Sequence, residues 1–211
     1  MTNSTPSFLR RYTDLPALLH MLAEKKITLL DPKTWDDRND SFFMSIYKER
    51  KKLRTVLALC FSQTSQTYHH WRVFSNGPAG VCIEFDRDAL LKTMLQIPGV
   101  ICRSIEYLTL KDAKEQQLKV NNLPFVKRHG FGPEKEFRVI YTSSSKELPS
   151  LDVSIGIDCI RSVSLSPWMH SDLSKSTIAA IRAIEECAKV KVSRSTLISN
   201  EQWKSLGKDA A

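Results

Sequence analysis

The segment Glu134–Tyr141 carries the residues whose types and spacing best suit chemistry. It reads Glu-Lys-Glu-Phe-Arg-Val-Ile-Tyr, and the alternation of an extended strand would place Glu134, Glu136 and Arg138 on one face. A carboxylate and a guanidinium on one strand face form an ion pair, and such a pair in a cleft can hold a ribose hydroxyl or an anion. The alternative is an exposed, salt-bridged strand face, and the pattern alone leaves both open.

A second stretch with uncommon residue choices runs from Trp71 to Asp86. Its second half, Gly80-Val-Cys-Ile-Glu-Phe-Asp86, alternates in the manner of a strand. We expect this stretch to face the strand at 134–141. Asp86 is placed to accept hydrogen bonds from the free amides of a helix over 88–95.

The segment Lys33–Phe43 has an unusual composition, because three aspartates and an asparagine lie between aromatic residues. We expect a loop here. It is either a binding loop, in which apolar anchors fix a polar cluster, or a surface turn that satisfies its own hydrogen bonds.

The hydrophobic pattern predicts the elements that position these residues. Thr55–Phe61 is almost continuously apolar, as expected for a central strand buried on both faces. Leucines at helical spacing predict a helix over 15–22, capped by Asp14. The remaining segments are expected to form strands at 8–12, 27–30, 100–108, 160–165 and 190–195, and helical structure at 110–128 and 172–190.

These elements predict an α+β fold with a mixed, mainly antiparallel split sheet flanked by helices. At 211 residues the chain is long enough for one sizeable core, so we expect a single domain over 1–211. The ends at 1–7 and 204–211 are expected to be flexible.

Composition favours a cytoplasmic protein. The chain contains no apolar run near the length of a membrane helix, and its start lacks the pattern of a secretory signal. Five widely spaced cysteines without a C-x-x-C pair favour reduced thiols over disulfides or a zinc site. We therefore expect no bound metal and no membrane partner.

The excess of positive charge indicates an anionic partner. Thirty-one Lys and Arg against twenty-three Asp and Glu give a net charge of +8, which favours nucleic acid, nucleotides or acidic proteins. The basic residues are spread along the chain and are not interleaved with aromatic residues as a stacking groove requires. Solvated helix faces are therefore the alternative.

Six motifs in order make the chain resemble a bacterial family of domains of unknown function. The family has a Tyr-containing strand and Leu-rich helix, followed by P-x-x-F-N-D-x-F-D, C-F-S, W-x-H-Y, G-V-C-I-x-F-D and E-x-E-x-R. The corresponding residues here are Arg11-Tyr12 with Leu18-Leu19, Pro32–Asp40, Cys60–Ser62, Trp71–Phe74, Gly80–Asp86 and Glu134–Arg138. Trp35-Asp36 replace Phe-Asn and Val73-Phe74 replace His-Tyr, so chemistry that used the family's histidine or tyrosine would be missing.

This layout is also similar to the ADP-ribosyltransferase fold. In that fold a split antiparallel sheet clamps NAD, and a glutamate on a late strand stabilises oxocarbenium-like charge as the glycosidic bond breaks. The resemblance implies that Glu136 is the catalytic carboxylate and that Arg138 holds it in place. It also implies that Arg11 and Tyr12 contact the NAD ribose or phosphate. Ser62 and Trp71 would line the nicotinamide pocket.

Two functional hypotheses follow. The first is an NAD-consuming ADP-ribosyltransferase-like enzyme, acting as a toxin or a phage-defence effector. The second is a non-catalytic basic domain that binds nucleic acid or a protein partner.

Overall fold

Antiparallel strand pairing dominates the computed structural model, which describes residues 6–75 and 77–208. The chain forms two compact units. Within the described residues, unit 1 contains 6–9, Lys26–Thr64 and Asp86–Ile155, and unit 2 contains Arg10–Lys25, Ser65–Phe85 and 156–208. The predicted α+β class with a mainly antiparallel sheet is confirmed. The assignment of the whole chain to one domain stays a prediction.

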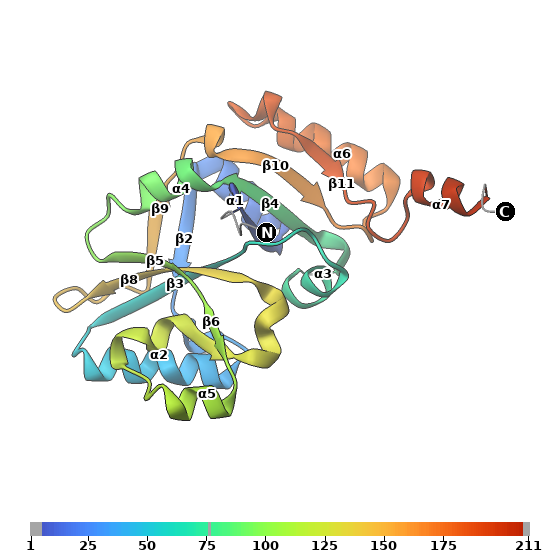
Figure 1. Cartoon of the computed structure of the whole chain (residues 1–211). Helices are drawn as coiled ribbons and strands as arrows, with labels where there is room; N and C mark the ends of the chain where they lie inside the picture. The colour runs from blue at the N-terminus through green and yellow to red at the C-terminus, as the bar shows by residue number, and fades with distance from the viewer. Residues whose placement is uncertain (1–5, 76, 209–211) are drawn as a thin grey trace. The chain divides into compact units, whose positions relative to one another are not determined.

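The strands of unit 1 follow the order β9-β2-β3-β8-β5, and each neighbouring pair is antiparallel (Figure 1). At its centre β3 and β8 pair without interruption, from Thr55 opposite Ser143 to Ser62 opposite Glu136. The strands span Lys26–Leu30 (β2), Thr55–Ser62 (β3), Val100–Ser104 (β5), Glu136–Ser143 (β8) and Ser150–Ser154 (β9).

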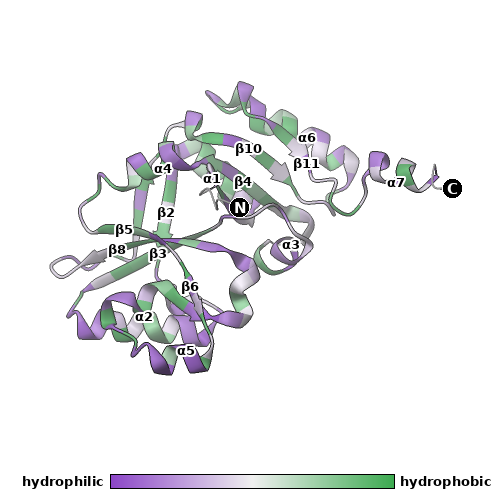
Figure 2. Ribbon diagram, viewed as in Figure 1, coloured by the Kyte–Doolittle hydropathy of each residue, from purple (hydrophilic) through white to green (hydrophobic). Residues whose placement is uncertain are grey.

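The central position of β3 follows from its sequence. Every residue of β3 except Cys60 is buried, as the apolar run predicts. Helix α2 lies against one face, where Met44 and Tyr47 pack on Ala58 and Ile140. Figure 2 shows β3 largely hydrophobic, whereas α2 alternates between hydrophilic and hydrophobic residues along its length.

The other elements of unit 1 connect or cover these strands. Two of them, β6 and β7, form a separate parallel pair. The remaining elements of unit 1 span Pro32–Thr34 (η1), Arg38–Arg50 (α2), Arg87–Met94 (α4), Glu106–Leu108 (β6), Leu110–Glu115 (α5), Val120–Phe125 (η3), Val126–Arg128 (β7) and His129–Glu134 (η4).

In unit 2, β10 pairs antiparallel with β4 and parallel with β11. Helix α6 contributes the fully buried Ile181 to the core and lies beside β11 (Figure 1). The elements span Leu15–Glu24 (α1), Tyr68–Phe74 (α3), Gly77–Ala79 (η2), Gly80–Asp86 (β4), Ile157–Cys159 (η5), Ile160–Leu165 (β10), Ser171–Ala183 (α6), Cys187–Lys189 (η6), Val192–Arg194 (β11) and Glu201–Lys208 (α7). Strand β1 (Phe8–Asp14) has its first two residues in unit 1 and the rest in unit 2.

The predicted loop at 33–43 is wrong, because α2 begins within it. The Asp37 carboxylate accepts hydrogen bonds from the backbone N–H groups of Asn39 and Asp40 at 3.0 and 3.4 Å. Asp37 is therefore the N-cap of a helix. Aspartate side chains that bond to nearby backbone N–H groups are typical of loops and turns, but the same chemistry also starts helices.

Several other boundaries also differ from the prediction. Strand β8 begins at Glu136, because Lys135 has a positive φ of 46°. The predicted helix at 172–190 ends at Ala183, and the last three residues of the segment predicted as helical, Val126–Arg128, form β7. The segment at 71–86 does not pair with the strand at 134–141: β4 pairs with β10, whereas β8 pairs with β3 and β5.

The remaining expectations concern the two chain ends, the state of the cysteines and a membrane-spanning helix. Residues 1–5 and 209–211 lie outside the described residues, and 201–208 forms α7. All five cysteines are free thiols, three of them buried. Within the described part of the chain, no helix is long and apolar enough to cross a membrane.

Candidate functional site

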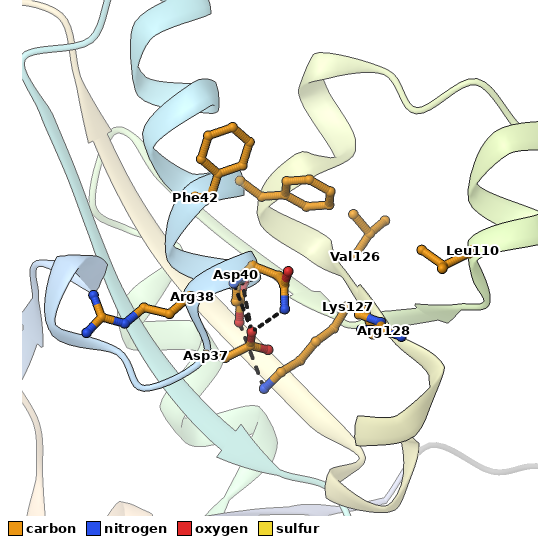
Figure 3. A pocket seen from close by; sticks show the side chains of 10 residues that line it. Asp37, Arg38, Asp40, Phe42, Leu110, Val126, Lys127 and Arg128 are labelled. Carbon is orange, nitrogen blue, oxygen red and sulfur yellow. Dashed lines mark hydrogen bonds and ion pairs between the residues drawn. The ribbon is translucent and has the colours of Figure 1, made fainter.

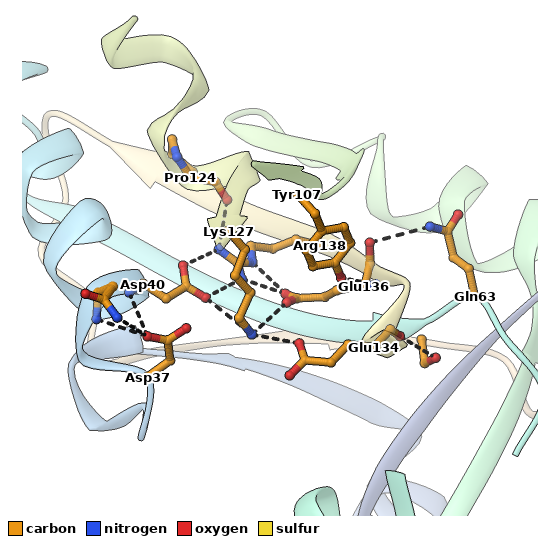
Figure 4. A network of polar contacts seen from close by, with 11 residues as sticks. Asp37, Asp40, Gln63, Tyr107, Pro124, Lys127, Glu134, Glu136 and Arg138 are labelled. Atoms are coloured by element: carbon orange, nitrogen blue, oxygen red, sulfur yellow. Dashed lines mark hydrogen bonds and ion pairs between the residues drawn. The ribbon is translucent and has the colours of Figure 1, made fainter. Parts of the chain in front are cut away.

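Arg138 is the centre of a buried ionic cluster in unit 1 (Figure 4). Its Nε donates to Glu136 Oε1 at 2.7 Å. The two terminal nitrogens donate to the two oxygens of Asp40 at 2.8 and 2.6 Å, which is the bidentate fork geometry of strong arginine–carboxylate pairs. Arg138 also donates to the Pro124 carbonyl at 2.9 Å and lies over the Trp35 ring at 4.6 Å.

Lys127 of β7 is the second cation of this cluster. Its Nζ lies 2.7 Å from Glu134 Oε2, 3.4 Å from Glu136 Oε2 and 3.9 Å from Asp40. The cluster thus contains two cations and three carboxylates, and the five side chains are each less than 10 % exposed. The same-face ion pair predicted from the sequence is present, but its face is buried and not solvated.

The backbone explains why two glutamates of one segment reach the same lysine. Strict strand alternation would have placed Glu134 and Glu136 on one face, but Glu134 ends η4 and Lys135 adopts the left-handed region. The chain then re-enters extended geometry at Glu136, whose N–H donates to the Tyr107 hydroxyl at 2.8 Å. Ser62, paired opposite Glu136, donates from its hydroxyl to the Glu134 carbonyl at 2.8 Å.

The three carboxylates differ in their electrostatics. Burial raises the pKa of Asp40 and of Glu134, and their ion pairs only partly offset this effect. Burial would also raise the pKa of Glu136, but the charge and hydrogen bond of Arg138, together with Lys127, outweigh it and lower the pKa. Glu136 is therefore the carboxylate of the cluster whose ionised form the fold favours.

A pocket of about 330 Å³ lies beside the cluster, also within unit 1. Figure 3 shows Asp37, Asp40 and Lys127 converging at one end of it, with Phe42 farther along α2. Phe42 and Leu110 line the pocket and are 59 % and 66 % exposed. Their side chains therefore give much of the pocket an apolar surface. Such a pocket suits an apolar group with a polar edge. It is lined by Asp37, Arg38, Asn39, Asp40, Phe42, Phe43, Leu110, Val126, Lys127 and Arg128.

In unit 2, Tyr12 joins an aromatic cluster with α3. Its ring is stacked on His70 and edge-on to Trp71, with centroids 5.4 Å away in both cases. Trp71 is fully buried and donates from Nε1 to Gln66 Oε1 at 3.1 Å. The Tyr12 hydroxyl lies against the Cys82 thiol, and burial raises the pKa of Tyr12.

The residues predicted from the sequence therefore fall into two groups. Unit 1 brings together Glu136, Arg138 and Ser62. Unit 2 brings together Tyr12 and Trp71, and the half-buried Arg11 precedes Tyr12 on β1. Their roles toward NAD stay predictions.

Asp40 and Lys127 were not identified from the sequence as partners of Arg138. Asp40 was visible only as one of several aspartates in a presumed loop, and Lys127 as one of many lysines. A signal for Asp40 was present, because residues four and seven positions after it, Met44 and Tyr47, continue one apolar helix face. No comparable signal marks Lys127.

Comparison with known proteins gave matches among solved structures alone. No family model and no curated protein matches the chain. Three similar structures are of Thermus sp. 2.9 DarT: a complex with ADP-ribosylated ssDNA (12% identity, TM-score 0.48, covering 92% of this chain and 97% of that one), one with carba-NAD+ (10%, 0.46, 91% and 97%) and one with NAD+ (10%, 0.45, 92% and 98%). At TM-scores below 0.5 these similarities assign neither a fold family nor an activity to this chain.

Proposed function

We propose that this chain is an NAD-consuming ADP-ribosyltransferase-like enzyme with Glu136 as its catalytic carboxylate. One observation carries the proposal. Of the three carboxylates in the buried cluster, Glu136 is the one whose pKa is lowered, and its Oε1 is fixed by Arg138 at 2.7 Å. A carboxylate that is ionised, shielded from water and held in one orientation suits the stabilisation of a cationic transition state.

The reaction would use Glu136 as follows. The bond between ribose C1′ and the nicotinamide nitrogen of NAD breaks, and nicotinamide leaves with the electron pair. Positive charge develops on the ribose, and the Glu136 carboxylate stabilises it. A nucleophilic oxygen or nitrogen of the acceptor, or water, then bonds to C1′ and releases a proton.

The two oxygens of Glu136 would have different tasks. Oε1 is committed to Arg138, whereas Oε2 makes the longer contact of 3.4 Å to Lys127. We assign Oε2 to the substrate. Arg138 is then a positioning residue, and the remaining NAD contacts are proposed for Arg11, Tyr12, Ser62 and Trp71.

Release of nicotinamide from NAD by the purified chain tests this proposal. We expect turnover by the wild type and a loss on the order of 10²-fold or more in Glu136→Gln, because removing one preorganised electrostatic group has an effect of about this size. Glu134→Gln is the matched control, since it removes a carboxylate from the same cluster and should keep activity within about threefold. A melting curve of each variant separates lost chemistry from lost folding.

Two results would contradict the proposal. One is wild-type protein that releases no nicotinamide with water, protein or nucleic acid offered as acceptor. The other is a folded Glu136→Gln variant with wild-type turnover. Either would favour the non-catalytic basic domain, for which the net charge of +8 is the supporting observation.

We further propose that the activity serves as a toxin or phage-defence effector. Expression in a bacterial host should then slow growth, and Glu136→Gln should relieve the effect at equal protein level. Equal toxicity of the two proteins would contradict this role.

A further inference from the structure

A second polar cluster in unit 1 centres on Arg87, the first residue of α4. Its Nη1 donates to Gln63 Oε1 at 3.0 Å, and Gln63 Nε2 donates to Ser104 Oγ at 3.0 Å. The guanidinium lies over the ring of Phe137 at 4.4 Å. Phe137 points away from the face that carries Glu136 and Arg138, because successive strand residues alternate.

Arg87 differs in its partners from Arg138 and Arg10, two other arginines that are fully or partly buried. Arg138 is paired with Asp40 and Glu136, and Arg10 is 2.6 Å from Glu84. Arg87 makes no ion pair within residues 6–75 and 77–208. Burial lowers the pKa of Arg87, and the charge of the exposed Asp88 only partly offsets this effect.

A fixed, half-buried cation bonded only to neutral groups suits an anionic ligand. The Phe137 ring covers one face of the guanidinium and Gln63 occupies one of its N–H groups. The remaining N–H groups have the planar fork that matches two oxygens of an oxyanion. Ser104 is exposed, and its hydroxyl is 3.2 Å from Gln63 Oε1, the atom that also accepts from Arg87. The hydroxyl therefore lies beside this fork, and it can rotate to donate to a ligand while it still accepts from Gln63 Nε2.

We infer that Arg87, Gln63 and Ser104 form a binding site for a phosphate group. Two oxygens of the phosphate would accept from the Arg87 guanidinium and a third from Ser104, while Gln63 orients both side chains. The phosphate belongs to a nucleotide or to a polynucleotide backbone. This inference does not depend on Glu136 or on the reaction proposed above.

Calorimetric titration of the full chain tests the site with four probes. Inorganic pyrophosphate and ADP should bind, whereas adenosine, which lacks phosphate, should not. A short single-stranded oligothymidylate is the fourth probe. Binding of ADP assigns the site to nucleotide phosphates, and binding of the oligothymidylate alone assigns it to a polynucleotide backbone.

Arg87→Met should weaken binding by about tenfold to a hundredfold, as expected for the loss of charged hydrogen bonds. Arg103→Met is the matched control, because Arg103 is exposed on β5 and also lies over a ring, that of Phe125, at 5.2 Å. It should bind like the wild type. Ser104→Ala changes an exposed side chain and should weaken binding by about threefold.

The inference fails if none of the phosphate-bearing probes binds, or if Arg87→Met binds them as tightly as the wild type. An equal loss in Arg103→Met would also overturn it, since the effect would then reflect net charge. If Arg87→Met does not fold, unchanged binding by the folded Ser104→Ala variant is the contradicting result.

Discussion

The two faces of β8 hold arginines in opposite situations. On one face Arg138 is fully buried, bonded to Asp40 and Glu136, and lies over Trp35. On the other face Arg87 lies over Phe137, half-buried, with Gln63 as its hydrogen-bond partner. Both guanidinium groups use an aromatic ring for orientation, but only the first is neutralised.

This difference distinguishes two roles of a buried or half-buried arginine: one stabilises the fold, and the other can bind a ligand. A fully buried cation is tolerated only when carboxylates and hydrogen bonds compensate for its lost hydration. A half-buried cation keeps part of its hydration and can stay without a counter-ion. The first arrangement therefore fixes its neighbours, and the second is available to an anion that arrives later.

The largest change in the free energy of unfolding should come from removing Arg138, the neutralised arginine. Arg138→Met leaves Asp40 and Glu136 buried with only Lys127 as a cation, and removing one partner of a buried ion pair costs about 3–5 kcal/mol. We expect a loss of this size in the free energy of unfolding, measured by urea denaturation.

Arg103→Met is the control for this loss, because Arg103 lies directly opposite Arg138 on β5 and is exposed. It should change the free energy of unfolding by less than about 0.5 kcal/mol. A loss of only 1 kcal/mol in Arg138→Met would mean that water reaches the cluster and solvates its carboxylates.

An effect of intermediate size should appear in how the contributions of Glu134 and Glu136 to the free energy of unfolding change with pH. The folded pKa of Glu136 lies below its ordinary 4.5, so its contribution to stability is present above pH 4.5 and is lost as the pH falls through the folded value. The folded pKa of Glu134 is raised above 4.5. Its contribution is present below pH 4.5 and is lost as the pH rises through the folded value.

Unfolding free energies of Glu136→Gln and Glu134→Gln between pH 7 and pH 3 measure these contributions. The advantage of the wild type over Glu136→Gln should shrink as the pH falls. Relative to Glu134→Gln, the wild type should gain as the pH falls. If the free energies of unfolding of the two variants changed with pH in the same way, the pKa values of Glu134 and Glu136 would not be shifted in opposite directions.

The sequence predicted one part of this contrast, the pairing of Glu136 with Arg138, and the missing parts have a physical reason. Alternation along the strand correctly paired Glu136 with Arg138, since period two is a local property of the chain. Asp40 and Lys127 lie 98 and 11 residues from Arg138 in sequence, and only the packing of α2 and β7 against the sheet brings them close. Nothing in the local pattern reports such packing.

The same limit explains why Arg87 was not identified. The sequence marks only its neighbour Asp86, which starts α4 as expected, with its carboxylate accepting from the Ala89 N–H at 3.0 Å. The stacking of Arg87 on Phe137 depends on how α4 packs against β8, which is distant in sequence. An arginine at the start of a helix is otherwise unremarkable in sequence.

The smallest change in the free energy of unfolding is expected for Arg87→Met. This variant is also the sharpest test of the contrast between Arg138 and Arg87. The Arg87 guanidinium has no carboxylate partner, so its removal leaves no buried negative charge unpaired. The methionine side chain can still cover the Phe137 ring. The lost hydrogen bond to Gln63 should cost about 1 kcal/mol or less in the free energy of unfolding. A loss as large as that of Arg138→Met, again measured by urea denaturation, would mean that Arg87 is needed for folding and would remove the reason to regard it as a charge held for a ligand.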